Sequence, residues 1–180
     1  MTALSFRLYA ITDRRCGSPE PLLARTEPGT VAVQLRDKDL PLPERRVLAE
    51  ATRDLCRRFA APLFIGGGDV ELARRVGADG VHLPSRYVPA ARDDLLVACS
   101  CHDLAELDRA GSAGVDLVTL SPVLASPDKG APMGWPRFSE FAHRTAVPVF
   151  ALGGLSPEDL DRACAHGAFG VAGIRAFLGG

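Results

Sequence analysis

The chain has 180 residues, of which 47% are hydrophobic and 24% are charged, and its formal net charge at pH 7 is −1. This length predicts one domain with a single core, over residues 1–180. The near-neutral charge predicts no basic surface for nucleic acid, and no apolar run approaches the ~20 residues of a membrane span. The start lacks the pattern of a signal peptide, and the five cysteines are scattered. We therefore expect a cytoplasmic protein with reduced thiols.

Short apolar runs rich in β-branched residues recur along the chain and predict strands at residues 8–12, 31–36, 62–66, 80–83, 95–100, 117–121, 147–152 and 169–174. Helical patterns lie between most of these runs. An amphipathic stripe over 43–60 predicts one helix, and Ser156 followed by Pro157 predicts the start of another.

A weak internal repeat of helix, glycine turn and strand appears at 70–81, 104–115 and 160–171. Such repeats imply parallel strands joined by crossover helices. Eight of these strands in one domain favour a closed (β/α)8 TIM barrel. The rival, an open Rossmann-like sheet, lacks its G-x-G-x-x-G fingerprint after the first strand.

The end of the sequence predicts a short or missing eighth helix, because only RAFLGG follows the last strand. The helices after the first and fourth strands must also be brief. We expect the flank between the last and first strands to be covered by the N-terminal segment or by a second copy of the chain, as in a homodimer.

Functional groups of a barrel gather where its strands end. Gln34, Arg36 and Lys38 share one face at the end of the second strand, and the two cations favour an anion site. Ser100 and His102 end the fifth strand. His102 is a candidate acid–base group, and it is an equally good candidate for capping the next helix.

Two further strand ends carry candidate binding groups. The loop after the sixth strand holds Ser126 and Lys129, which by themselves decide nothing. Glycines end both the seventh and eighth strands, where barrels commonly bind phosphate through backbone N–H groups. The predicted phosphate-binding residues are Gly153, Gly154, Gly173, Ile174 and Arg175.

The motifs LYAITD, QLRDK, ADGVHL, SCH, SPVLASPDK, FALGG and FGVAGI occur in the order found in thiamine phosphate synthases and their TenI-like relatives. The chain resembles this family from Leu8 to about Phe177. The resemblance implies a (β/α)8 barrel. Synthases of the family join a pyrimidine methyl pyrophosphate to a thiazole phosphate and expel pyrophosphate with the help of Mg²⁺.

The resemblance also implies roles for the candidate residues. Gln34, Arg36 and Lys38 match contacts to pyrophosphate and pyrimidine, and Ser100 matches a serine on the pyrimidine side. Ser126 and Lys129 match the hydroxyl and lysine of the family's T-x-T-K loop. Gly153 and residues 173–175 match the thiazole phosphate site, with Arg175 where the family usually has serine.

The metal aspartates of the synthases have no counterpart here. Gly67 and Gly68 stand where synthases have Asn-Asp, and Tyr87 stands in place of the second aspartate. We therefore expect no metal ligand, and Mg²⁺ only if the chain is an active synthase. Asp69 is predicted to be a helix N-cap, with a metal ligand reached by a loop shift as the alternative.

These departures favour a TenI-like barrel that binds a thiazole phosphate. Known TenI-like proteins include a tautomerase with a histidine in the sixth loop, where this chain has Pro122. Its proton carrier is then expected to be His102, with His82 second, and Lys129 as a further catalytic candidate. The alternatives are an active synthase that also binds pyrimidine pyrophosphate, and a non-catalytic phosphate-ligand-binding protein.

Overall fold

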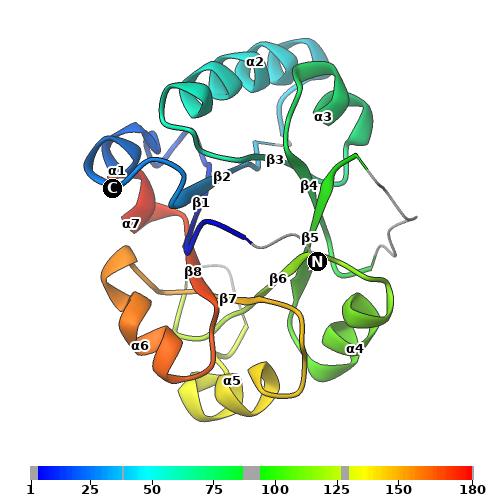
Figure 1. Ribbon diagram of the computed structural model, residues 1–180, viewed down its shortest axis with the longest axis vertical. Helices are drawn as coiled ribbons and strands as arrows, with labels where there is room; N and C mark the ends of the chain where they lie inside the picture. The colour runs from blue at the N-terminus through cyan, green and yellow to red at the C-terminus, as the bar shows by residue number, and fades with distance from the viewer. Residues whose placement is uncertain (1–3, 38, 87–93, 127–129, 180) are drawn as a thin grey trace.

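A computed structural model describes residues 4–37, 39–86, 94–126 and 130–179, so Lys38, Tyr87 and Lys129 lie outside the described residues. Within these ranges, eight parallel strands pair in sequence order and close into a barrel (Figure 1). The strands are β1 (Leu8–Ile11), β2 (Val31–Leu35), β3 (Leu63–Gly66), β4 (Gly80–Leu83), β5 (Leu96–Cys101), β6 (Leu117–Leu120), β7 (Val149–Leu152) and β8 (Gly170–Gly173). The predicted TIM barrel is confirmed.

Helices surround the barrel (Figure 1). They are α1 (Glu20–Arg25), α2 (Leu42–Arg58), α3 (Val70–Val76), α4 (Leu104–Ser112), α5 (Gly134–Ala142), the 3₁₀ turn η1 (Pro157–Asp159) with α6 (Leu160–Ala165), and α7 (Arg175–Leu178). The predicted start at Ser156 is confirmed, since its N–H donates to the Asp159 carboxylate at 2.8 Å. No helix in the described ranges is long and apolar enough to cross a membrane.

The four-residue α7 replaces a full eighth helix. Its Phe177 and Leu178 are buried, and α7 packs against β1 and α1 (Figure 1). Gly17 lies directly against the Leu178 carbonyl, where a Cβ would clash. The flank between β8 and β1 is therefore covered within the chain itself, and covering it requires no second copy.

The barrel interior is closed at one end by a cluster of aromatic rings from Phe6, Tyr9, Phe64 and Phe150. The centroids of Phe6 and Phe150 lie 5.5 Å apart, and those of Tyr9 and Phe64 lie 5.4 Å apart. Glycines opposite these rings leave the space they need: a Cβ at Gly80 would lie 2.6 Å from the Phe64 ring. The cluster fills the amino-terminal half of the barrel, so the inward positions near the strand ends remain for a ligand.

Candidate functional site

A cavity of about 500 Å³ opens at the carboxyl ends of the strands, within the size range of small-molecule sites. It contains most of the residues that the sequence singles out. Those residues are Gln34, Arg36, Ser126, Gly153, Gly154, Gly173, Ile174 and Arg175. His82 and Thr119 line it as well. Residues from opposite sides of the barrel thus meet around one space, because the closed sheet brings all strand ends together.

Two unpaired polar atoms lie in the cavity wall. Gln34 is 6% exposed and Thr119 is 0% exposed, and among the described residues Gln34 Oε1 and Thr119 Oγ1 have no hydrogen-bond partner. Leaving a buried polar atom unpaired costs about 1–3 kcal/mol. A ligand that forms hydrogen bonds to these atoms would recover this cost.

His82 lies between Tyr9 and Ser100. Its Nδ1 is 3.1 Å from Tyr9 Oη, and its Nε2 is 2.9 Å from Ser100 Oγ. Burial lowers the pKa of His82 to about 4, so the imidazole is neutral at pH 7. Ser100 is half-buried and is not itself among the residues that line the cavity, but it pairs in register with Thr119 and is hydrogen-bonded to His82, which both line it.

Glycines form the cavity wall at the ends of β7 and β8. Gly153 and Gly154 have φ of 110° and 67°, a region that favours glycine. A Cβ at Gly153 would lie 2.9 Å from Pro122 Cα, and one at Gly154 would lie 2.6 Å from the Ala125 carbonyl oxygen. These glycines therefore allow the loop after β6 to pack closely. Arg175 is exposed and lines the same end of the cavity, so its guanidinium places a positive charge there.

Arg36 is held at the cavity mouth by the loops after β1 and β2. Its backbone N–H donates to Thr12 Oγ1 at 3.0 Å, and the Thr12 hydroxyl donates to the buried Asp37. Its guanidinium lies 3.6 Å from the Asp13 carboxylate. The side chain is 43% exposed and so remains accessible to a ligand that enters the cavity.

His102 lies apart from the cavity lining. Its backbone N–H and its Nδ1 lie 2.7 and 2.9 Å from Glu106 Oε2 at the start of α4. Asp103 begins that helix by accepting the Glu106 N–H at 2.8 Å. Asp103 and not His102 is therefore the N-cap of α4, and His102 pairs with the Glu106 side chain. His82 is the histidine that lines the cavity.

Tyr9 and Thr119 are two further polar residues at the site whose roles no sequence motif marks. The signal for Thr119 was present, because the alternation along residues 117–121 directs it to the face opposite Val118. Nothing in the sequence distinguished that face as the inner one. Tyr9 lies in an apolar run, and only the barrel places its hydroxyl against His82.

The side chains near Gly67 and Gly68 do not fit a carboxylate-held Mg²⁺. Asp69 accepts the Leu72 N–H at 3.0 Å, which confirms the predicted N-cap, and its second oxygen lies 3.0 Å from Arg45 Nη1. Arg45 Nη2 also donates to the Gly66 carbonyl at 2.6 Å. In the described ranges, no group of three His, Cys, Asp or Glu side chains is placed to hold a metal ion.

One protein-family model matches nearly the whole chain. The model described as thiamine monophosphate synthase matches residues 8–177. The chain belongs to this family. A Geobacter sulfurreducens protein named, provisionally, as a thiamine-phosphate synthase is 40% identical, over 99% of this chain and 89% of its own. The thiamine-phosphate synthase of Thioalkalivibrio sulfidiphilus is 38% identical, over 92% and 84%.

A solved structure of the same family agrees with the fold. Thiamine phosphate pyrophosphorylase from Pyrococcus furiosus superposes with a TM-score of 0.83 at 27% identity, covering 98% of this chain and 89% of the other. Membership of the thiamine monophosphate synthase family is therefore supported both by sequence and by structure.

Proposed function

We propose that the chain binds a thiazole phosphate in the barrel cavity and joins it to a pyrimidine methyl pyrophosphate, the reaction of the thiamine-phosphate synthases that it resembles. The observation that carries this proposal is the cavity itself. One end of this space is walled by glycines and carries Arg175, and Gln34 and His82 line the other side. Ser100 lies directly behind this lining, hydrogen-bonded to His82.

The thiazole phosphate is assigned to the glycine-walled end. Gly153 and Gly154 line this end of the cavity, and phosphate oxygens bind well to backbone N–H groups. The Arg175 guanidinium adds donors that match phosphate oxygens in geometry and charge. Ser126 lies on the loop that packs over this end and is proposed to contact the same substrate.

The pyrimidine pyrophosphate is assigned to the β2 side. Arg36 is proposed to hold the pyrophosphate and to stabilise the charge that grows as it departs. Lys38 and Lys129, outside the described residues, are proposed to act with Arg36. In family synthases bound Mg²⁺ supplies this stabilisation, and the side chains described here do not reproduce that site. The proposal therefore relies on cationic side chains for the leaving group.

A thiazole tautomerase, as in TenI-like proteins, is the second candidate. The missing metal carboxylates favour it, as does His82, a neutral imidazole in the cavity wall. A neutral imidazole can accept a proton, which a tautomerase requires. In this reaction only the thiazole phosphate end of the cavity is needed, and the β2 side is free to hold the ring that carries the moving proton.

Product analysis separates the candidates. The purified protein is incubated with hydroxymethylpyrimidine pyrophosphate and thiazole phosphate, with and without Mg²⁺, and separately with the thiazole carboxylate phosphate tautomer. We expect thiamine phosphate in the first mixture. Aromatisation of the tautomer without thiamine phosphate would establish the second candidate. Binding of thiazole phosphate with neither product would indicate a non-catalytic binding protein.

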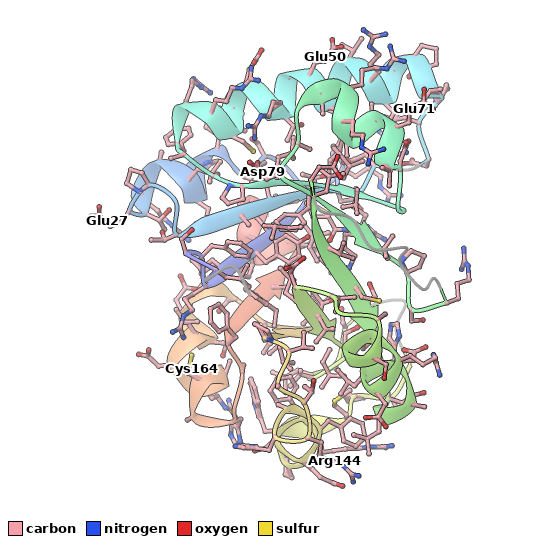
Figure 2. The ribbon with its side chains drawn as sticks, turned by 45° about the vertical axis from the view of Figure 1, so that its right-hand side comes forward. Glu27, Glu50, Glu71, Asp79, Arg144 and Cys164 are labelled. Atoms are coloured by element: carbon pink, nitrogen blue, oxygen red, sulfur yellow. The ribbon has the colours of Figure 1, made fainter. Side chains whose placement is uncertain are left out.

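The substrate assignment has its own test. Arg175→Gln removes an exposed cation from the cavity and is expected to weaken thiazole phosphate binding about tenfold, as measured by calorimetry. Arg144→Gln is the matched control, because Arg144 is exposed at the outer edge of the molecule, near α5 (Figure 2). Equal affinities for the two variants would contradict the phosphate site.

A further inference from the structure

Tyr9, His82 and Ser100 form a chain of hydrogen bonds that runs from the aromatic cluster, through the cavity-lining His82, to the half-buried Ser100. The three residues come from β1, β4 and β5. Tyr9 is fully buried and His82 is 4% exposed, whereas Ser100 is half-buried. The Tyr9 and His82 rings are also stacked, with centroids 5.8 Å apart and planes 25° apart. The geometry of the first two members is therefore fixed by packing.

The two hydrogen bonds run in one direction, from Tyr9 through His82 to Ser100. Among the described residues, His82 Nδ1 is the hydrogen-bond partner of Tyr9 Oη. If Nδ1 carried a proton, the phenolic proton of Tyr9 would have no acceptor in a fully buried site. The phenol therefore donates to Nδ1, and the neutral imidazole carries its proton on Nε2. That proton is donated to Ser100 Oγ at 2.9 Å.

We propose that Tyr9 and His82 are positioning residues that fix Ser100 as a hydrogen-bond donor to the ligand. Because Ser100 Oγ accepts from His82, its own proton is directed away from His82 toward the partly exposed side. The ligand group that it meets is then an acceptor, such as an unprotonated ring nitrogen. The identity of this ligand as the pyrimidine rests on the proposed function, whereas the direction of the chain does not.

The unpaired atoms in the cavity wall complete the pattern. Gln34 Oε1 is an acceptor only, and it has no partner among the described residues. The site therefore offers a donor at Ser100 and an acceptor at Gln34. A heteroaromatic ring with both an acceptor nitrogen and an N–H donor satisfies both residues. A ring tautomer with N–H in place of the acceptor nitrogen would place two protons against each other at Ser100.

Nitrogen NMR of the histidine rings tests the direction. Spectra of ¹⁵N-labelled protein are assigned to His82 by comparison with His82→Gln. We expect the neutral Nε2–H tautomer at pH 7, and in Tyr9→Phe a shift of the Nδ1 resonance toward that of a nitrogen without a hydrogen bond. An Nδ1–H tautomer, or an unchanged Nδ1 shift in Tyr9→Phe, would overturn the proposal. If Tyr9 only packed the barrel and made no hydrogen bond to Nδ1, Tyr9→Phe would leave the Nδ1 resonance unchanged.

A double-mutant cycle tests whether Tyr9 acts through Ser100. Calorimetry measures the affinity for hydroxymethylpyrimidine pyrophosphate in the parent, Tyr9→Phe, Ser100→Ala and the double variant. We expect Tyr9→Phe to weaken binding about fivefold in the parent and to have no effect when residue 100 is alanine. Equal losses in both backgrounds would overturn the proposal. Thermal unfolding of each variant confirms that it is folded.

The two tests separate this inference from the proposed function. If the parent binds neither hydroxymethylpyrimidine pyrophosphate nor thiazole phosphate, the proposed function fails, and the NMR spectra alone then decide the direction of the chain. If the parent binds the pyrimidine but the cycle is additive, the proposed function stands and the positioning role fails.

Discussion

His82 makes the stability of the barrel sensitive to acid. Its side chain is buried and lies between Tyr9 and Ser100, and burial lowers its pKa from the ordinary value of 6.5 to about 4. In the unfolded chain the imidazole is free to take up a proton near pH 6.5, whereas in the folded barrel it resists protonation down to about pH 4. Between these values the unfolded state binds more protons.

The sign and size of the effect follow from this difference. Because the folded pKa is depressed, the contribution of His82 to stability is complete above pH 6.5 and is lost as the pH falls toward 4. Each pH unit in this window corresponds to about 1.4 kcal/mol. The full loss is therefore about 3.5 kcal/mol, and about 2.5 kcal/mol of it has occurred at pH 4.5.

The assay compares denaturant unfolding of the parent and His82→Gln at pH 7 and pH 4.5. Glutamine keeps an acceptor for Tyr9 and a donor for Ser100 but does not titrate. We expect the free energy of unfolding to fall by about 2.5 kcal/mol less in His82→Gln than in the parent. His143→Gln, which replaces an exposed histidine, is the control. The same pH-dependent loss in the parent and in His82→Gln would show that His82 does not cause the acid sensitivity.

Three further predictions concern the same end of the barrel. Thr119→Val should raise the free energy of unfolding by about 1 kcal/mol while weakening ligand binding, because it removes an unpaired buried hydroxyl; calorimetry and denaturation measure both. Gly153→Ala should lower the free energy of unfolding by about 2 kcal/mol in denaturant titrations, because φ is 110° and a Cβ would lie 2.9 Å from Pro122 Cα. Asp69→Ala should lower the free energy of unfolding by about 2 kcal/mol without changing any Mg²⁺ dependence of turnover. The control is Glu71→Ala, at the outer edge of the molecule in Figure 2, which should lower the free energy of unfolding by less than about 0.5 kcal/mol.

Much of the fold follows from local patterns. Strand and helix positions depend on short-range periodicity, so the strands appear within one or two residues of their predicted bounds, and α2 at Leu42–Arg58 matches the stripe over 43–60. Parallel strands require crossover helices, and the alternation of the two elements therefore predicts the barrel. Asp69 and Ser156 acted as predicted, because capping involves only the next three residues.

In the glycine run FIGGGD (residues 64–69), one property of the site can be read from the sequence alone. Gly67 and Gly68 offer no carboxylate, and this is visible without a structure. The contacts that hold this loop are not visible in the sequence. The guanidinium of Arg45 comes from α2 and bonds to Gly66 and Asp69, a contact between residues that are more than 20 positions apart. No local pattern indicates it.

The assignment of polar residues to the cavity required the tertiary structure. From the sequence, His102 and His82 each follow or end an apolar run and are both candidates. The structure places His82 inside the barrel, whereas the first turn of α4 brings Glu106 against His102. Whether a strand residue faces inward depends on register around the closed sheet, and the chain alone determines alternation but not which face is inner. The sequence thus determined the elements and the glycine-bearing strand ends, and barrel closure decided which side chains share the cavity.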